Sequence, residues 1–226
     1  MKNTKTLIVS FYTLGSPYEK EASFLKQSCE KLNLDFCIEP ISCQGSWEKN
    51  CCFKPTFLKE KLLKYKQNIL WIDCDAIVVK PLYIFNTIDE DIAAKYIHDA
   101  HASHPSKLMS GTLFLKYNPR ILNLLDHWEK ACAEQLKRDK KTWDQTVLRD
   151  VLAQDKHISL FSLPKAYCQV YDKIQNEEEL QDSVIIHFQA SRFTKKQESI
   201  APLFKQLQHA HKKACVDAIL NHFSSK

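Results

Sequence analysis

The pattern of apolar and polar positions over the first 75 residues predicts alternating strands and helices. A capping box begins the first helix, with Ser16 as N-cap, Pro17 in the first turn and Glu19 three residues after the cap. The run over 68–72 is apolar without alternation, which suits a strand buried on both faces. The elements expected here are strands over 7–12, 35–41 and 68–72, helices over 16–32 and 55–65, and a loop over 42–53. This order favours a parallel sheet with helices on both faces.

The second half of the chain has shorter apolar runs. The elements expected there are strands over 92–97, 112–115, 157–161, 168–171 and 184–188, a polar loop over 98–107, helices over 121–136 and from Thr142 as a cap with Gln145 three residues on, and an amphipathic helix within 200–223. No linker rich in Pro, Gly or Ser divides the chain. We therefore expect one α/β domain over 1–226, with a mainly parallel twisted sheet, and a basic helical tail over 191–226 packed on it.

Glycine content excludes two kinds of phosphate site. The chain has three glycines, Gly15, Gly45 and Gly111, and they are far apart. A P-loop and a Rossmann dinucleotide loop both need clustered glycines to bring backbone N–H groups to phosphate. Any phosphate must therefore be held by a metal ion or by side chains.

The net charge of +5 resides in the tail. Residues 191–226 contain seven Lys or Arg against two acidic residues, so the rest of the chain is neutral. A neutral body with a basic tail does not fit a nucleic-acid binder, which needs a basic face interleaved with aromatic residues. The tail helix is expected to pack on the sheet and to show its lysines to water. The sharper alternative is a weak, reversible contact of its basic face with an anionic membrane.

The cysteines point to a reducing compartment. There are nine, an odd number without a CxxC pair, and we expect neither a signal peptide nor a membrane span. Reduced thiols predict a cytoplasmic protein. The membrane alternative would place it peripherally at the inner face of the membrane.

The most informative motif is Asp73-Cys74-Asp75, between the apolar runs 69–72 and 76–79. Residues i and i+2 of an extended chain point the same way, and ligands of open α/β sheets lie at the carboxyl ends of strands. Two neighbouring carboxylates repel each other unless a cation lies between them. Mg²⁺ or Mn²⁺ held in this way also takes substrate phosphate oxygens. The alternative is a pair of solvated aspartates in a turn.

Two enzyme chemistries use such a pair. A haloacid-dehalogenase-like phosphatase uses an aspartate as nucleophile, but it needs a second acidic pair near glycine, and this chain has no Gly-Asp step. In glycosyl transfer from a nucleotide sugar the pair holds a metal ion instead. A third possibility is a nucleotide-sugar binding protein without turnover.

A set of segments along the chain favours glycosyl transfer over phosphatase chemistry. In chain order they are 45–51 with Lys54, Pro55 and Leu58, then 69–76, 108–113, 143–145, 163–164 with Tyr167 and Cys168, and 187–192. Together they resemble the bacterial nucleotide-diphospho-sugar transferases, glycosyltransferases of the GT-A fold with an Asp-x-Asp (DxD) motif. The resemblance implies that fold, a nucleotide-sugar donor and a divalent metal.

The resemblance also implies roles near the diphosphate. His187 would complete the metal site of Asp73 and Asp75, the alternative being a core histidine with a backbone partner. Residues Gln189, Ser191 and Arg192 would then face the diphosphate, with Arg192 supplying positive charge to the leaving group. The alternative for Arg192 is a solvated residue at the start of the basic tail.

Further residues are expected at the donor and the acceptor. Asp144 and Gln145 are the candidate catalytic residues: Asp144 would contact sugar hydroxyls or, in an inverting enzyme, act as base, whereas in a retaining enzyme the leaving phosphate takes that part. Its alternative role is to stabilise a helix N-terminus. The donor-binding candidates are Tyr12, Thr13, Lys54, Ser110 and Gly111. The alternative roles are a core aromatic for Tyr12, a surface lysine for Lys54 and a bulge for Gly111.

We therefore expect transfer of a sugar from a nucleotide diphosphate sugar, with a UDP-sugar as the expected donor, to a hydroxyl of a glycan or lipid-linked acceptor. Mn²⁺ or Mg²⁺ would assist through Asp73 and Asp75.

Overall fold

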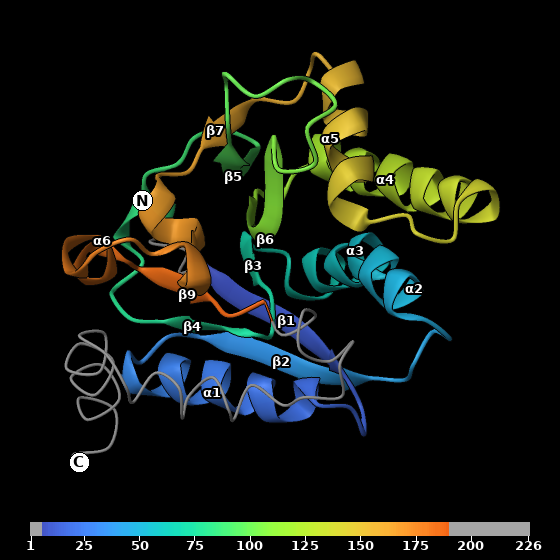
Figure 1. The fold of residues 1–226 in the computed structure, drawn as a ribbon. Coiled ribbons are helices and arrows are strands. Elements are labelled where there is room, and N and C mark those ends of the chain that lie inside the picture. The colour runs from blue at the N-terminus through green and yellow to red at the C-terminus, as the bar shows by residue number, and fades with distance from the viewer. Residues whose placement is uncertain (1–5, 190–226) are drawn as a thin grey trace.

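The computed structural model describes residues 6–189 (Figure 1). The helices are α1 (Tyr18–Lys31), α2 (Trp47–Cys52), α3 (Lys54–Tyr65), α4 (Pro119–Arg138), α5 (Asp144–Gln154) and α6 (Glu177–Asp182), with short 3-10 turns η1 (Tyr83–Asn86), η2 (Lys165–Cys168) and η3 (Tyr171–Lys173). The strands are β1 (Leu7–Thr13), β2 (Phe36–Ile41), β3 (Ile69–Ile72), β4 (Ala76–Val78), β5 (Ile92–Tyr96), β6 (Leu108–Leu115), β7 (Leu160–Ser162), β8 (Gln169–Val170) and β9 (Ile185–His187).

The central sheet has six strands in the order β2-β1-β3-β6-β5-β7. β1 pairs in parallel with β2 and β3, and β5 with β7, whereas β6 runs antiparallel to both of its neighbours. The predicted α/β class and the parallel pairing of the first three strands are confirmed, and the sheet as a whole is mixed. β6 reverses direction because only the loop 97–107 connects it to β5, which is too short for a parallel crossover through a helix.

A second sheet of three short strands, β4-β9-β8, lies beside the first. β4 follows the acidic pair directly and runs antiparallel to β9, with Ala76 opposite His187. β8 pairs in parallel with β9. This pairing joins the end of the described chain to the residues that follow β3.

Hydrophobic residues pack on both faces of the central sheet. Side chains of a strand alternate, so Leu7 and Val9 belong to one buried cluster and Ile8 to the other. The first cluster contains residues of α3, α4 and α5, and the second contains residues of α1, β4 and β9. Figure 1 shows α1 on one side of the sheet and α3 and α4 on the other. The predicted three-layer arrangement is therefore confirmed.

Two predicted helix starts are wrong in detail. α1 begins at Tyr18 without a side-chain cap, because the Ser16 hydroxyl donates to Thr13 O and closes a turn before the helix. Glu19 does reach back, but it accepts from the backbone N–H of Gly15. Thr142 likewise donates to a backbone carbonyl, and α5 begins at Asp144.

The expected loop over 42–53 is also partly wrong. It contains the short helix α2, whose N-cap Ser46 accepts from the backbone N–H of Lys49 at 3.2 Å. The strand expected over 157–161 begins only at Leu160, and β8 has just two residues because 3-10 turns flank it on both sides.

Some predictions fall outside the described residues. These are the basic tail with its amphipathic helix and its membrane contact, together with the site candidates Ser191 and Arg192. Among residues 6–189, no helix combines the length and the apolar character that crossing a bilayer requires.

Candidate functional site

A cavity of about 890 Å³ opens where β1 and β3 end. Its volume falls within the usual range for small-ligand sites, at the carboxyl ends of parallel strands where such ligands bind. Every site residue predicted from the sequence and present among the described residues lines it: Tyr12, Thr13, Lys54, Asp73, Asp75, Ser110, Gly111, Asp144, Gln145, His187 and Gln189.

The acidic pair lies on a turn rather than on an extended strand. β3 ends at Ile72, and Ala76 N–H donates to Asp73 O at 3.1 Å, so the chain reverses over 73–76. The expectation that strand alternation aligns the two carboxylates is therefore wrong. Asp73 N–H donates to Gly111 O and Asp75 O accepts from Phe188 N–H, both at 2.9 Å. These bonds fasten the turn to β6 and to the chain after β9.

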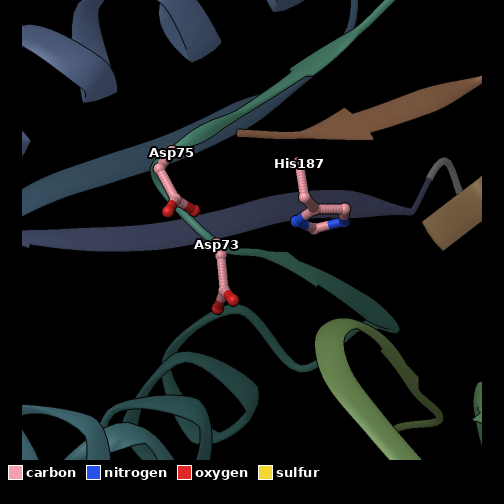
Figure 2. Close-up of side chains that lie close together, drawn as sticks. All are labelled: Asp73, Asp75 and His187. Atoms are coloured by element: carbon pink, nitrogen blue, oxygen red, sulfur yellow. The ribbon is translucent and has the colours of Figure 1, made fainter. Parts of the chain in front are cut away.

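Asp73, Asp75 and His187 form a cluster of potential metal ligands. One ligand atom of each lies within 4.8 Å of the others, and Figure 2 shows the two carboxylates on the turn and the imidazole on β9. Both aspartates are half-buried, whereas His187 is buried. Carboxylate oxygens with an imidazole nitrogen suit Mn²⁺, and carboxylates with substrate oxygens suit Mg²⁺. The donor set therefore fits the divalent ion implied by the sequence.

Thr112 sets which ring nitrogen of His187 is free. Its Oγ1 lies 2.9 Å from Tyr167 O and 2.9 Å from His187 Nε2. A carbonyl can only accept, so the single hydroxyl proton goes to Tyr167, and Thr112 must accept from the Nε2–H of His187. Burial lowers the pKa of His187 to about 4, so the ring is neutral at pH 7. A neutral ring protonated at Nε2 leaves the Nδ1 lone pair free to bind a metal.

Gly111 leaves open the space between two candidate ligands. A Cβ at this position would lie 3.0 Å from His187 Cε1 and 3.2 Å from both His187 Nδ1 and Asp73 Oδ2. Any side chain would therefore fill the gap that a shared metal ion would occupy. A close approach to the site, and not a left-handed turn, accounts for glycine here.

Lys54 joins Asp73 to Asp144. Its Nζ lies 2.8 Å from Asp144 Oδ2 and 3.2 Å from Asp73 Oδ1, and the side chain is buried. Burial alone would lower the pKa of Lys54, but the charges of Asp144 and Asp73 outweigh it and raise the pKa above its usual value. Trp71 also donates from Nε1 to Asp73 Oδ1, at 2.8 Å. These two donors hold one oxygen of Asp73, and the other faces Gly111 and His187.

The two candidate catalytic residues are held by β6. Ser110 Oγ donates to Asp144 Oδ2 at 2.9 Å, so this oxygen is shared between Ser110 and Lys54. Gln145 accepts from Ser110 N–H at 3.1 Å and donates to Pro105 O at 2.8 Å. Gln145 thus ties the loop 97–107 to the start of α5.

At the end of β1, Tyr12 and Thr13 line the cavity. Tyr12 is 9% exposed, belongs to a buried cluster, and has Lys26 Nζ at 5.2 Å from its ring centre. Gln189 also lines the cavity, and its φ of 56° is one that non-glycine residues adopt rarely. Such conformations occur preferentially at functional sites.

Sequence reasoning missed two tryptophans and a glutamate. Trp47 and Trp143 line the cavity with ring centres 6.2 Å apart, and Trp143 is 42% exposed. Both stood in segments that carry the family resemblance, which was the available signal. Glu21 on α1 is buried, and burial together with the charge of Asp75 raises its pKa to about 7. Only the fold brings it near the acidic turn.

Comparisons with known proteins identify a family and similar folds. A model of the nucleotide-diphospho-sugar transferase family matches residues 46–198. No curated protein sequence matches the chain. A glycosyltransferase involved in the glycosylation of the major capsid of PBCV-1 has a similar structure, with a TM-score of 0.63 and 12% identity, covering 82% of this chain and 93% of that one.

The glycosyltransferase GlyE of Streptococcus pneumoniae TIGR4 is similar too, with a TM-score of 0.58 and 14% identity. The alignment covers 95% of this chain but only 63% of GlyE, so GlyE is the longer protein. Because both identities are low, these two structural similarities show a shared fold and no more.

Proposed function

The chain belongs to the nucleotide-diphospho-sugar transferase family, and we propose that it transfers a sugar from a UDP-sugar to a hydroxyl of a glycan or lipid-linked acceptor. We propose further that Asp73, Asp75 and His187 hold Mn²⁺ or Mg²⁺. The observation that carries this proposal is the convergence of these three side chains in one large cavity.

A divalent ion bound there would offset the charge of the departing nucleoside diphosphate. The surrounding residues prepare its ligands. Lys54 and Trp71 occupy one oxygen of Asp73, which leaves the other for the ion. Thr112 keeps the proton of His187 on Nε2 and so leaves Nδ1 as the ligand atom. Such supporting contacts fix the orientation of metal ligands and tune their basicity.

We assign Asp144 to binding hydroxyls of the donor sugar. Its Oδ2 is already bonded to Lys54 and Ser110, so both contacts fix the carboxylate in place at the cavity wall. If the reaction inverts, Asp144 remains the candidate base; if it retains, the leaving phosphate serves. Through its hydrogen bonds to Ser110 and Pro105, Gln145 would hold the loop 97–107 and β6 next to Asp144 at the start of α5.

The nucleoside is assigned to the end of β1, against Tyr12 and Thr13; Trp47 also lines this cavity. Gln189 would meet the diphosphate next to His187. The cysteines of the described chain are free, which supports a reducing, cytoplasmic setting.

The test measures binding and turnover separately. Isothermal titration of UDP with Mn²⁺ should show binding that chelator abolishes, and release of UDP from UDP-sugars should depend on the metal. Asp75→Asn should lose both while keeping its fold. Asp89→Asn, which removes an exposed carboxylate outside the cavity, should behave as the parent.

Equal binding by Asp75→Asn and the parent would refute the metal site. Metal-dependent binding without UDP release from any donor would identify a nucleotide-sugar binding protein without turnover.

A further inference from the structure

The cavity has a basic wall that the proposed function does not use. Lys95, Lys165 and Lys173 line it from β5 and from the turns that flank β8. Lys165 forms an ion pair with Glu179 at 2.6 Å. Within residues 6–189, Lys95 and Lys173 form no ion pair, so no acidic side chain of that part of the chain neutralises their charges.

An irregularity of the sheet places Lys95. The β5–β6 pairing jumps from Ala94 opposite Leu113 to Lys95 opposite Met109, so three residues of β6 bulge out at the site. Bulges commonly redirect side chains beside active sites. The same bulge contains Gly111 and Thr112, which contact the candidate ligands.

Lys173 is placed by the small sheet. Val170 of β8 lies opposite His187 of β9, and Lys173 ends the 3-10 turn η3 that follows Val170. Gln169, the other residue of β8, also lines the cavity and is 2% exposed. Its amide nitrogen is buried and has no hydrogen-bond partner among residues 6–189, which is costly unless a ligand supplies an acceptor.

The charge balance of the cavity with an ion and a nucleotide sugar bound suggests a role for these lysines. The carboxylates of Asp73 and Asp75 balance a divalent ion, and Lys54 is already balanced by Asp144. One divalent ion cannot offset the charge of both these carboxylates and the diphosphate of a nucleotide sugar, so the site would keep a net negative charge. Lys95 and Lys173 are the cavity cations that remain unpaired among the described residues.

We propose that Lys95 and Lys173, with the amide of Gln169, form a second anion-binding wall that holds the diphosphate of the donor from the side of β5 and β8. This inference rests on the proposed function. The two lysines bind the diphosphate and stabilise it as it leaves, and the ion that Asp73, Asp75 and His187 would bind holds it from the acidic turn.

Inorganic diphosphate with Mn²⁺ is the probe, because it carries the phosphates without base or sugar. Its affinity is measured by isothermal titration for the full chain and for Lys95→Met and Lys173→Met. Each variant should bind about tenfold more weakly, since a charge-assisted hydrogen bond is lost. Lys95→Arg and Lys173→Arg should retain binding. Lys130→Met removes an exposed charge on α4, away from the cavity, and should match the parent.

The outcomes separate the two proposals. If the parent fails to bind diphosphate with Mn²⁺, the proposed metal-assisted function fails and the wall with it. If the parent binds and both Met variants bind within about twofold of it while remaining folded, only the wall is wrong. A loss of affinity for sodium glucuronate with unchanged diphosphate binding would also overturn it, by assigning the lysines to a sugar carboxylate.

Discussion

Replacing Thr112 by valine tests how His187 is prepared for metal binding. Valine keeps the shape of threonine but removes the oxygen that lies 2.9 Å from both His187 Nε2 and Tyr167 O. Thr112 is fully buried, so water cannot replace the hydroxyl. The proton of the neutral imidazole is then no longer held on Nε2 and can move to Nδ1, the atom that would bind the ion.

The expected loss follows from the role of such supporting contacts. Removing a partner of a metal-bound histidine typically weakens metal binding by about 10- to 100-fold, which corresponds to roughly 1.4–2.7 kcal/mol. The fold should also lose about 1–3 kcal/mol, because Tyr167 O and His187 Nε2 are left without a partner. Thr112→Ser keeps the hydroxyl and should retain most of the affinity.

The assay is Mn²⁺ binding in the presence of UDP, followed by electron paramagnetic resonance of free Mn²⁺. Urea unfolding of each variant confirms that the fold persists. If folded Thr112→Val binds Mn²⁺ within about twofold of the parent, the hydrogen bond does not set the ligand nitrogen and the reasoning fails.

Three other changes test the site and its surroundings. Gly111→Ala places a methyl 3.2 Å from both Asp73 Oδ2 and His187 Nδ1 and should abolish Mn²⁺ binding in a folded protein; unchanged affinity would exclude an ion between them. Glu21 has a pKa raised to about 7 in the folded protein, so its ionisation lowers the free energy of unfolding as pH rises above about 4.5. The variant Glu21→Gln should therefore stabilise the protein at pH 8 by up to about 3 kcal/mol, but little at pH 5. Equal gains in urea unfolding at both pH values would contradict this. Burial alone would raise the pKa of Asp91, but hydrogen bonds from Ser159 and the ion pair with Arg120 hold it at about 2. Asp91 therefore adds about 2 kcal/mol to the free energy of unfolding above pH 4, and this contribution is lost as pH falls towards 2. The stability difference between the parent and Asp91→Asn should shrink over that interval, and a constant difference would refute the assignment.

Local sequence patterns determined the order of most elements and the place of the candidate residues. Apolar runs and their spacing encode strands and helices, and the carboxyl ends of parallel strands meet at one edge. For this reason Thr13, which ends β1, and Asp73, which follows β3, line the same cavity although they are far apart in sequence. The family resemblance added His187, Asp144 and Gln145, whose positions at one cavity the structure shows and whose roles remain predictions.

Only the tertiary structure decided how these residues meet. His187 reaches the acidic turn because β9 pairs with β4, a contact between residues more than 100 positions apart that no local pattern specifies. The turn over 73–76 and the bulge in β6 depend on hydrogen bonds to other segments. Thr112 looked like an ordinary strand residue, and its hydroxyl acquires a role only because Tyr167 and His187 lie on either side of it. Periodicity reports which side chains are buried, whereas long-range pairing selects their partners and therefore their chemistry.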